Sequence, residues 1–269
     1  MSKDALRQIS IPDGDATLGL APAADEFTTR CVDDDPELLA QTYRLRYRVY
    51  CVERAFLRAS DYPDELETDQ FDRYARHLGT FDREGRLVGT VRLVFPSILG
   101  LPLFHHCSVF SGETELHDPR HRIAEVSRLS VSRQHRTRSA WSHERRRSAR
   151  LDNVYARNDV VGFSLYRGLY QESKRGGLTH WVVATEASLQ RAVADYGFPF
   201  RLIGQEIDYF GPVAPYMMDL ALFDRIILSG TKSRLDGFLD GLEASHRPAR
   251  PEDWPDLRPS TAWTQPKVE

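Results

Sequence analysis

The chain has 269 residues, with 36 Lys and Arg against 39 Asp and Glu and a formal net charge of −3. This slightly acidic balance argues against a general nucleic-acid-binding protein, which would carry clustered positive charge. No apolar run is long enough to cross a bilayer, and the first residues lack the apolar core of a signal peptide. The length suits one large domain or one domain with tails.

Three cysteines, Cys31, Cys51 and Cys107, are odd in number and widely spaced. This pattern indicates reduced thiols rather than a disulfide framework, so we expect a cytoplasmic protein. A group of His and Cys side chains in one loop lacks regular ligand spacing, and we therefore expect no metal site. The group consists of His105, His106, Cys107, His117 and His121.

Composition divides the chain into three parts. Residues 1–25 are polar and contain Ala and Pro, which is typical of a mobile N-terminal segment. Residues 26–244 hold the periodic apolar patterns and are expected to form one domain. In residues 245–269 prolines recur, which indicates a polyproline-like or disordered C-terminal tail.

The domain begins with the patterns of a strand and a helix. Residues 27–32 alternate weakly between apolar and polar side chains, as in a strand. Asp34 or Asp35 can cap a helix that begins at Pro36, and apolar residues follow with helical spacing as far as Val52.

A hairpin is predicted next. Residues 57–72 are acidic and have no clear period, whereas residues 76–82 and 86–95 read as two strands. The turn between them, Asp82-Arg83-Glu84-Gly85, ends on a glycine that can adopt a left-handed conformation. The remaining predicted elements are a strand at 123–131, an arginine-rich loop at 132–158, a helix at 162–175, a strand at 181–184, a helix at 187–194, a strand at 216–222 and a helix from 223.

Two charged segments stand out. Glu67-Thr68-Asp69-Gln70-Phe71-Asp72 places three carboxylates close together, which on its own favours a solvated loop. A calcium loop is a poor alternative, because the glycine of the sharp turn is missing. Glu125 and Arg128 lie inside an apolar strand, where charges are costly unless they are paired. We therefore expect side chains from four segments to neutralise one another: Arg46, Asp69, Asp72, Arg92 and Glu125.

Four short motifs occur in order along the chain: Arg46-X-X-Val49-Tyr50, Glu67-X-Asp69-X-X-Asp72, Arg92-Leu93 and Glu125-X-Ser127-Arg128. Together they resemble the signature of the acyl-homoserine-lactone (autoinducer) synthases, the N-acyl amino acid synthases and the PEP-CTERM/exosortase-associated acyltransferases. All of these belong to the GNAT superfamily, and the resemblance spans roughly residues 27 to 225. It implies an α/β (α+β) GNAT fold over residues 26–244, with a central mixed, largely antiparallel twisted sheet flanked by helices.

Acyl transfer to an amine needs a base, because an ammonium group has no lone pair, and Glu125 is the candidate. Simple alternation places Glu125 and Arg128 on opposite faces, so a bulge is needed to bring them together. The alternative is that Arg128 merely pairs with an acid of the 67–72 segment. The resemblance implies a catalytic group and a substrate-binding group. The catalytic group is Glu125, Arg128 and Asp69, and the substrate-binding group is Arg46, Glu67, Asp72, Arg92, Leu129, Ser130 and Val131.

The backbone N–H groups of residues 129–131 are expected to stabilise the oxyanion. The sequence departs from the autoinducer synthases at Tyr50, where they usually carry Phe, and near Phe56, where they carry Trp. Both positions lie near the S-adenosylmethionine site of that family. The departures favour a simple amino acid as the acceptor.

The donor is inferred from a missing motif. Enzymes of the superfamily that use coenzyme A carry a glycine-rich loop that grips pyrophosphate, whereas residues 133–138 here have no glycine. We expect acyl carrier protein instead, bound through a basic surface, and the alternative is a solvated charged loop. The surface would consist of Arg133, Arg136, Arg138, Arg145, Arg146 and Arg147.

The expected protein is an N-acyltransferase that moves a fatty acyl chain from acyl carrier protein to the α-amine of an amino acid. Its co-substrate is an acyl-phosphopantetheine thioester, and no permanent cofactor or nucleic-acid partner is expected; the lipidic product leaves room for peripheral membrane contact. A homoserine-lactone synthase and a non-catalytic binder of an acidic partner are the alternatives. We also expect an apolar tunnel between residues 181–184 and 163–175, with Phe163, Tyr166 and Tyr170 in the core.

Overall fold

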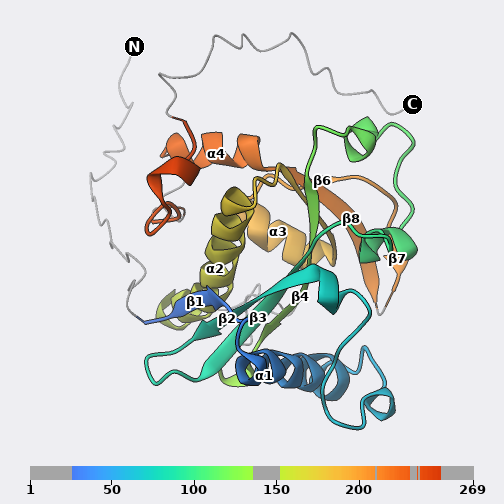
Figure 1. Cartoon of the computed structure of the whole chain (residues 1–269), viewed down its shortest axis with the longest axis vertical. Helices are drawn as coiled ribbons and strands as arrows, with labels where there is room; N and C mark the ends of the chain where they lie inside the picture. Colours follow the sequence, from blue (N-terminus) through green and yellow to red (C-terminus); the bar gives the residue numbers. More distant parts are fainter. Residues whose placement is uncertain (1–25, 136–151, 210, 231–234, 236, 250–269) are drawn as a thin grey trace, which may run out of the picture.

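The structure is a computed structural model, and it describes residues 26–135, 152–209, 211–230, 235 and 237–249. The predicted N-terminal segment and most of the predicted tail, from residue 250, lie outside these residues. An open sheet flanked by helices forms the body (Figure 1). Its strands are β1 (Thr28–Cys31), β2 (Ala75–Phe81), β3 (Leu87–Val94), β4 (Ile123–Val131), β5 (His180–Thr185), β6 (Arg201–Leu202), β7 (Ile207–Asp208) and β8 (Pro212–Asp219).

The sheet has the order β1-β2-β3-β4-β5-β8-β6, and β7 pairs with β8. Neighbouring strands are antiparallel except β4 and β5, which are parallel. The expected mixed, largely antiparallel sheet is therefore confirmed. The longer helices are α1 (Pro36–Tyr47), α2 (Asp152–Arg175), α3 (Ala187–Asp195) and α4 (Leu220–Leu228).

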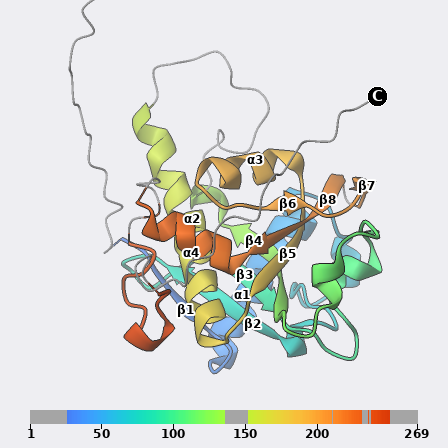
Figure 2. The same cartoon turned by 90° about the horizontal axis from the view of Figure 1, so that it is seen from above.

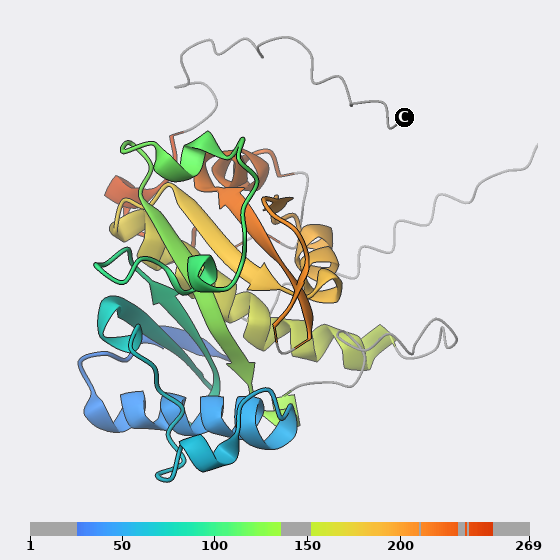
Figure 3. The ribbon, with the colours of Figure 1, turned by 90° about the vertical axis from the view of Figure 1, so that its right-hand side faces the viewer.

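Helix α1 and helix α2 pack on opposite faces of the hairpin strands. Arg46 of α1 lies over the face that carries His77 and Arg92, as their shared ion pairs with Asp72 show. Leu78, the neighbour of His77, belongs to the core cluster under α2, because successive side chains of a strand point to opposite faces. In two views α3 and α4 gather beside α2 (Figures 1 and 2), whereas α1 runs beneath the strands (Figure 3).

Local signals explain why these elements begin and end where they do. The Asp35 carboxylate accepts hydrogen bonds from the backbone N–H groups of Glu37 and Leu38, each at 3.1 Å, and so caps α1 as predicted. After Tyr47 the helix widens into a π-helical turn, η1 (Arg48–Glu53). The predicted hairpin turn is also present, with Gly85 at φ 76°.

Several predicted boundaries were wrong, and two short strands were missed. Helix α2 begins at Asp152 rather than at residue 162, so the end of the predicted arginine-rich loop is helical. Strand β8 covers Pro212–Asp219 instead of 216–222, because the strand continues through Pro215. The short strands β6 and β7 were not predicted at all.

The core confirms one expectation about α2. Tyr166 and Tyr170 are buried in the main apolar cluster, and Phe163 packs against it. The Phe163 and Tyr170 rings both contact Phe238, with centroids 4.8 and 5.8 Å apart. None of the helices in the described part of the chain combines the length and the apolarity that a membrane-spanning segment needs.

Candidate active site

Strand β4 contains a bulge at its centre. Arg92 of β3 faces Ser127, but Thr90 faces Ser130, so Arg128 and Leu129 together oppose Val91. Arg128 adopts φ 55°, a left-handed conformation that a non-glycine residue rarely takes. The extra residue bends the strand and leaves backbone groups unpaired. The bulge that the sequence required to bring Glu125 and Arg128 together is therefore present.

Strands β4 and β5 separate from each other at the same point. They pair only at Ile123, Ala124 and Glu125, which face His180, Trp181 and Val182. Both strands continue beyond this register, to Val131 and Thr185. An opening in the sheet therefore lies directly after Glu125.

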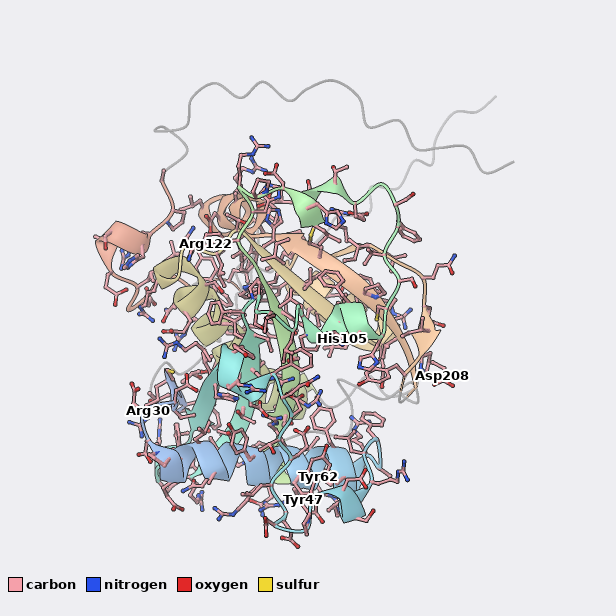
Figure 4. All side chains as sticks on the ribbon, turned by 45° about the vertical axis from the view of Figure 1, so that its right-hand side comes forward. Arg30, Tyr47, Tyr62, His105, Arg122 and Asp208 are labelled. Carbon is pink, nitrogen blue, oxygen red and sulfur yellow. The ribbon has the colours of Figure 1, made fainter. Side chains whose placement is uncertain are left out.

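A cavity of about 300 Å³ occupies this region. Its walls come from residues 49–57, from residues 102–107, from the bulged part of β4, and from residues 184–189 at the start of α3. In Figure 4, His105 marks η4 (Pro102–His105) on one side of this region, and Tyr47 marks the end of α1 on another.

The predicted route of an apolar tunnel was wrong. Among the described residues of α2, only Gly162 lines the cavity, and no residue of 163–175 does so. That helix face instead packs solidly in the core. Apolar wall is supplied by other segments, including Tyr50, Phe56 and Leu103.

Two buried arginines stand at the centre of an ion-pair cluster beside the cavity. Arg46, 1% exposed, donates through Nε to Glu67 at 2.5 Å and through both Nη atoms to Asp72 at 2.7 and 3.2 Å. Arg92 donates through Nη1 to Asp69 at 2.6 Å and to Asp72 at 2.8 Å. The acidic segment is therefore a set of buried counterions and not a solvated loop.

The Arg92 guanidinium also reaches the cavity wall. Its Nε donates to the hydroxyl of Ser127 at 3.1 Å, and Ser127 and Asp69 both line the cavity. Among the described residues, Nη2 of Arg92 is the one buried side-chain nitrogen or oxygen without a hydrogen-bond partner. An unsatisfied buried donor costs free energy, although Arg92 itself is fully buried and is not one of the residues that line the cavity.

Arg128 pairs with the acidic segment, as the structural alternative proposed. Its Nε donates to Glu67 at 3.0 Å and its Nη2 to Asp69 at 3.1 Å. The side chain also lines the cavity, and the ring centroid of Tyr50 lies 5.5 Å from its guanidinium carbon. The Tyr50 hydroxyl donates to the carbonyl of Leu129 at 3.3 Å. The hydroxyl that distinguishes Tyr50 from Phe therefore contacts the bulge.

His77 extends the cluster away from the cavity. Its Nδ1 lies 2.7 Å from Oδ1 of Asp33, and its Nε2 lies 3.0 Å from Oδ1 of Asp72. Burial alone would lower the pKa of His77, but the two carboxylate partners raise it above the usual value. Burial likewise opposes ionisation of Asp72, yet hydrogen bonds from His77 and Arg46 hold its pKa far below the usual range.

Glu125 stands outside this ion-pair cluster, contrary to the sequence-based expectation. Its side chain forms no ion pair among the described residues, and Oε2 accepts a hydrogen bond from the backbone N–H of Leu103 at 2.6 Å. Burial raises the pKa of Glu125 to about 7, against the opposing effects of the Leu103 N–H and of Arg92 and Arg128. Glu125 lines the cavity and is 4% exposed. A carboxyl group in this state can exchange a proton near neutral pH.

The other predicted site residues divide into two groups. Leu129 and Val131 line the cavity, whereas Ser130 is buried and does not. Arg133 lies in η6 (Arg133–His135), directly after β4. The remaining arginines of the predicted basic surface, Arg136, Arg138, Arg145, Arg146 and Arg147, lie outside the described residues.

Several cavity residues were not found from the sequence. Leu103 contributes through its backbone, which no side-chain pattern reveals. His106 stacks on Tyr209, with ring centroids 4.0 Å apart, and both line the cavity. The start of α3, with Ser188 and Leu189, forms another part of the wall. Within the described part of the chain, no group of three or more His, Cys, Asp or Glu side chains is placed to hold a metal ion.

The chain shares its fold with known proteins. Residues 45–144, which include Arg46, Arg92 and Glu125, match the acetyltransferase (GNAT) domain family. The coenzyme-A-dependent acyl-homoserine lactone synthase BjaI, solved with S-adenosylmethionine and isopentyl-coenzyme A, is 19% identical, with a TM-score of 0.52 over 80% of this chain and 88% of that one.

Two further structures are less similar. FeeM, an N-acyl amino acid synthase from uncultured soil microbes, is 14% identical, with a TM-score of 0.48 over 74% of this chain and 93% of its own. The acyl-homoserine-lactone synthase LasI is also 14% identical, with a TM-score of 0.47 over 73% of this chain and 91% of its own. A comparison with curated protein sequences gave no match. Residues 45–144 therefore carry a GNAT acetyltransferase domain, and the chain shares its fold with BjaI.

Proposed function

We propose that the protein is an N-acyltransferase that moves a fatty acyl chain from the thioester of acyl carrier protein to the α-amine of an amino acid. The observation that carries this proposal is Glu125. This buried carboxyl group, with a pKa near 7, faces a cavity that opens where β4 and β5 separate. A general base works best when its pKa lies near the working pH.

The reaction assigns a task to each part of the site. Glu125 takes a proton from the ammonium group, and the free amine attacks the thioester carbon. The negative charge that develops on the carbonyl oxygen is stabilised by backbone N–H groups of the bulge, at residues 129–131. The C–S bond then breaks, the thiolate of the phosphopantetheine arm takes the proton held by Glu125 and leaves as a thiol, and the nitrogen loses its second proton to water, so that the amide product remains.

The ion-pair cluster positions the acceptor side of the site. Arg46 and Glu67 are fully buried behind the wall, and with Asp72 they fix the orientation of Arg92 and Arg128. Asp69 and Arg128 reach the cavity itself and are assigned to acceptor contact. Arg92 reaches the cavity wall through its hydrogen bond to Ser127, at 3.1 Å, and through Asp69, and is assigned to positioning of these two residues.

The pH dependence of the rate follows from the state of Glu125. Because burial raises its pKa to about 7, kcat/KM should rise with pH through about 7 as the carboxylate forms. With an ordinary glutamate, this rise in kcat/KM, the acid limb of the pH profile, would lie near pH 4.3. Initial rates between pH 5 and 9 measure the limb, with a second acceptor of different amine pKa as a control. An acid limb near pH 4 would contradict the assignment.

The same proton also affects stability. The folded protein binds this proton more tightly than the unfolded chain, because the pKa of Glu125 is higher in the folded state. The resulting stabilisation of the fold is fully present below the pKa that Glu125 has in the unfolded chain, and it is lost as pH rises through about 7.

A homoserine-lactone synthase is the second candidate, favoured by the structural likeness to BjaI. One experiment separates the two functions. The purified protein is incubated with acyl carrier protein thioesters and either the twenty amino acids or S-adenosylmethionine, and products are identified by mass spectrometry. N-acyl amino acids support the proposal, whereas acyl-homoserine lactone formed with S-adenosylmethionine would replace it.

The donor is tested by a separate comparison. We expect higher kcat/KM with acyl carrier protein than with a coenzyme A thioester of the same chain length. Replacing Arg145, Arg146 and Arg147 by Ala should raise the KM for the carrier protein and leave the KM for the acceptor unchanged, because basic surfaces attract acidic carriers. This attraction is screened beyond about 8 Å at physiological salt, so added salt should weaken it.

The control for this surface is Arg120→Ala, since that exposed arginine pairs with Asp118 in another loop. Equal or better kcat/KM with coenzyme A would show that the donor assignment is wrong.

A further inference from the structure

The two arginines of the cavity wall have different surroundings. Arg128 is already neutralised, by Glu67 at 3.0 Å and Asp69 at 3.1 Å. Arg54 also lines the cavity, but its side chain is exposed and forms no ion pair with any described residue. Arg54 is therefore the cation of this wall whose charge is available to a ligand.

The backbone directs Arg54 and its neighbours to the cavity. The N–H of Arg54 donates to the carbonyl of Val49 at 3.0 Å, which closes the π-helical turn. Ala55 then takes φ 52°, a left-handed conformation that alanine rarely adopts. The N–H groups of Phe56 and Leu57 both return to one carbonyl, that of Tyr50, at 2.8 and 3.2 Å.

This turn places Arg54, Phe56 and Leu57 in the wall on either side of Ala55, which is not itself a lining residue. Strained non-glycine backbone often occurs at ligand-binding sites, and the second such residue at this cavity is Arg128. The strained residue Ala55 therefore directly follows Arg54, whose guanidinium is free to bind a ligand.

We infer that Arg54 binds the α-carboxylate of the amino-acid acceptor and selects acceptors that carry this group. The inference rests on the proposed function. A zwitterionic amino acid brings an ammonium group, for which Glu125 is the base, and a carboxylate that needs a cation. A planar guanidinium can bind a carboxylate through two parallel hydrogen bonds, which an amide or ester of the same amino acid cannot accept equally well.

The test compares two acceptors in two proteins. The best amino acid from a screen of the twenty is assayed beside its carboxamide, with the decanoyl thioester of acyl carrier protein as donor. The wild-type protein should prefer the free acid by about 10- to 100-fold in kcat/KM, the range of one charge-assisted interaction. Arg54→Ala should lose this preference through a higher KM for the acid, while kcat and the KM for the thioester stay unchanged. Arg54→Lys should recover part of it.

Arg58→Ala is the matched control. Its side chain is 87% exposed, does not line the cavity, and lies 4.0 Å from Asp61, so the preference for the acid should remain. An Arg54→Ala protein that still prefers the acid by the wild-type factor would overturn the inference.

Binding measured by calorimetry, without any donor, keeps this test separate from the proposed function. Binding of the amino acid that is weakened at least tenfold by Arg54→Ala supports the inference even if no acylated product forms. Undiminished binding, or none to the wild-type protein, overturns it.

Discussion

Replacing Glu125 by Gln is expected to lower kcat/KM for acyl transfer by about 100- to 10,000-fold, because an amide cannot accept the proton of the acceptor ammonium. The variant should fold normally. Among the described residues Glu125 has no ion-pair partner that would be left uncompensated, and the amide oxygen of Gln can still accept the N–H of Leu103. Steady-state rates at neutral pH measure the loss, and thermal unfolding followed by circular dichroism checks the fold.

Glu186→Gln provides the matched control. Glu186 is another carboxylate in the wall of the same cavity, and it accepts a hydrogen bond from Ser188 at 3.2 Å. This substitution should change kcat/KM by less than tenfold, since Glu186 precedes α3 and lies away from the bulge of β4 in the chain. Near-normal turnover by Glu125→Gln, or an equal loss in the control, would remove Glu125 from the role of base.

Replacing Arg46 by Met should destabilise the protein by about 3–5 kcal/mol, the range seen when one partner of a buried ion pair is removed. Met fills much of the space of the arginine stem but leaves the buried carboxylates Glu67 and Asp72 with one cation fewer. Urea unfolding followed by tryptophan fluorescence measures the loss, and Trp181 is a fully buried reporter. Activity should fall as well, because Asp72 also holds Arg92.

The matched control is Arg44, two residues before Arg46 on the same helix. The Arg44 side chain is 51% exposed and lies 3.9 Å from Glu37, so Arg44→Met should cost less than about 1 kcal/mol, as exposed pairs do. If Arg46→Met unfolded at the same urea concentration as the wild-type protein, the cluster would not stabilise the fold.

Much of the fold was predictable because local signals agreed with the tertiary structure. Asp35 before Pro36 marks the start of α1, and Gly85 marks the hairpin turn. The apolar run around Glu125 matches β4 from end to end. The first turns of α2 were missed, since residues 152–161 contain several charged and polar side chains. The beginning of β8 was missed because Pro212 and Pro215 are typical of strand edges.

The candidate site was predictable only in part. The sequence indicated that Arg92 would meet the acidic segment, because buried charges need partners, and the 2.6 Å contact with Asp69 confirms this. It also placed Glu125 in the same cluster, which was wrong. The partner of Glu125 is the backbone N–H of Leu103, in the short helix η4, 22 residues earlier in the chain. Every residue except proline carries a backbone N–H, so the residue types of the sequence could not indicate which one binds Glu125.

The short pairing between β4 and β5 has a mechanical consequence. In the described sheet, the half that holds β1 to β4 is joined to the half that holds β5 to β8 only through the register from Ile123 to Glu125. Beyond it, two strand edges face an empty strand position. A phosphopantetheine arm carries amide groups of its own, so an arm lying there would act as a temporary strand. Under the proposed function, binding of the donor would therefore complete the hydrogen-bonded sheet between β4 and β5.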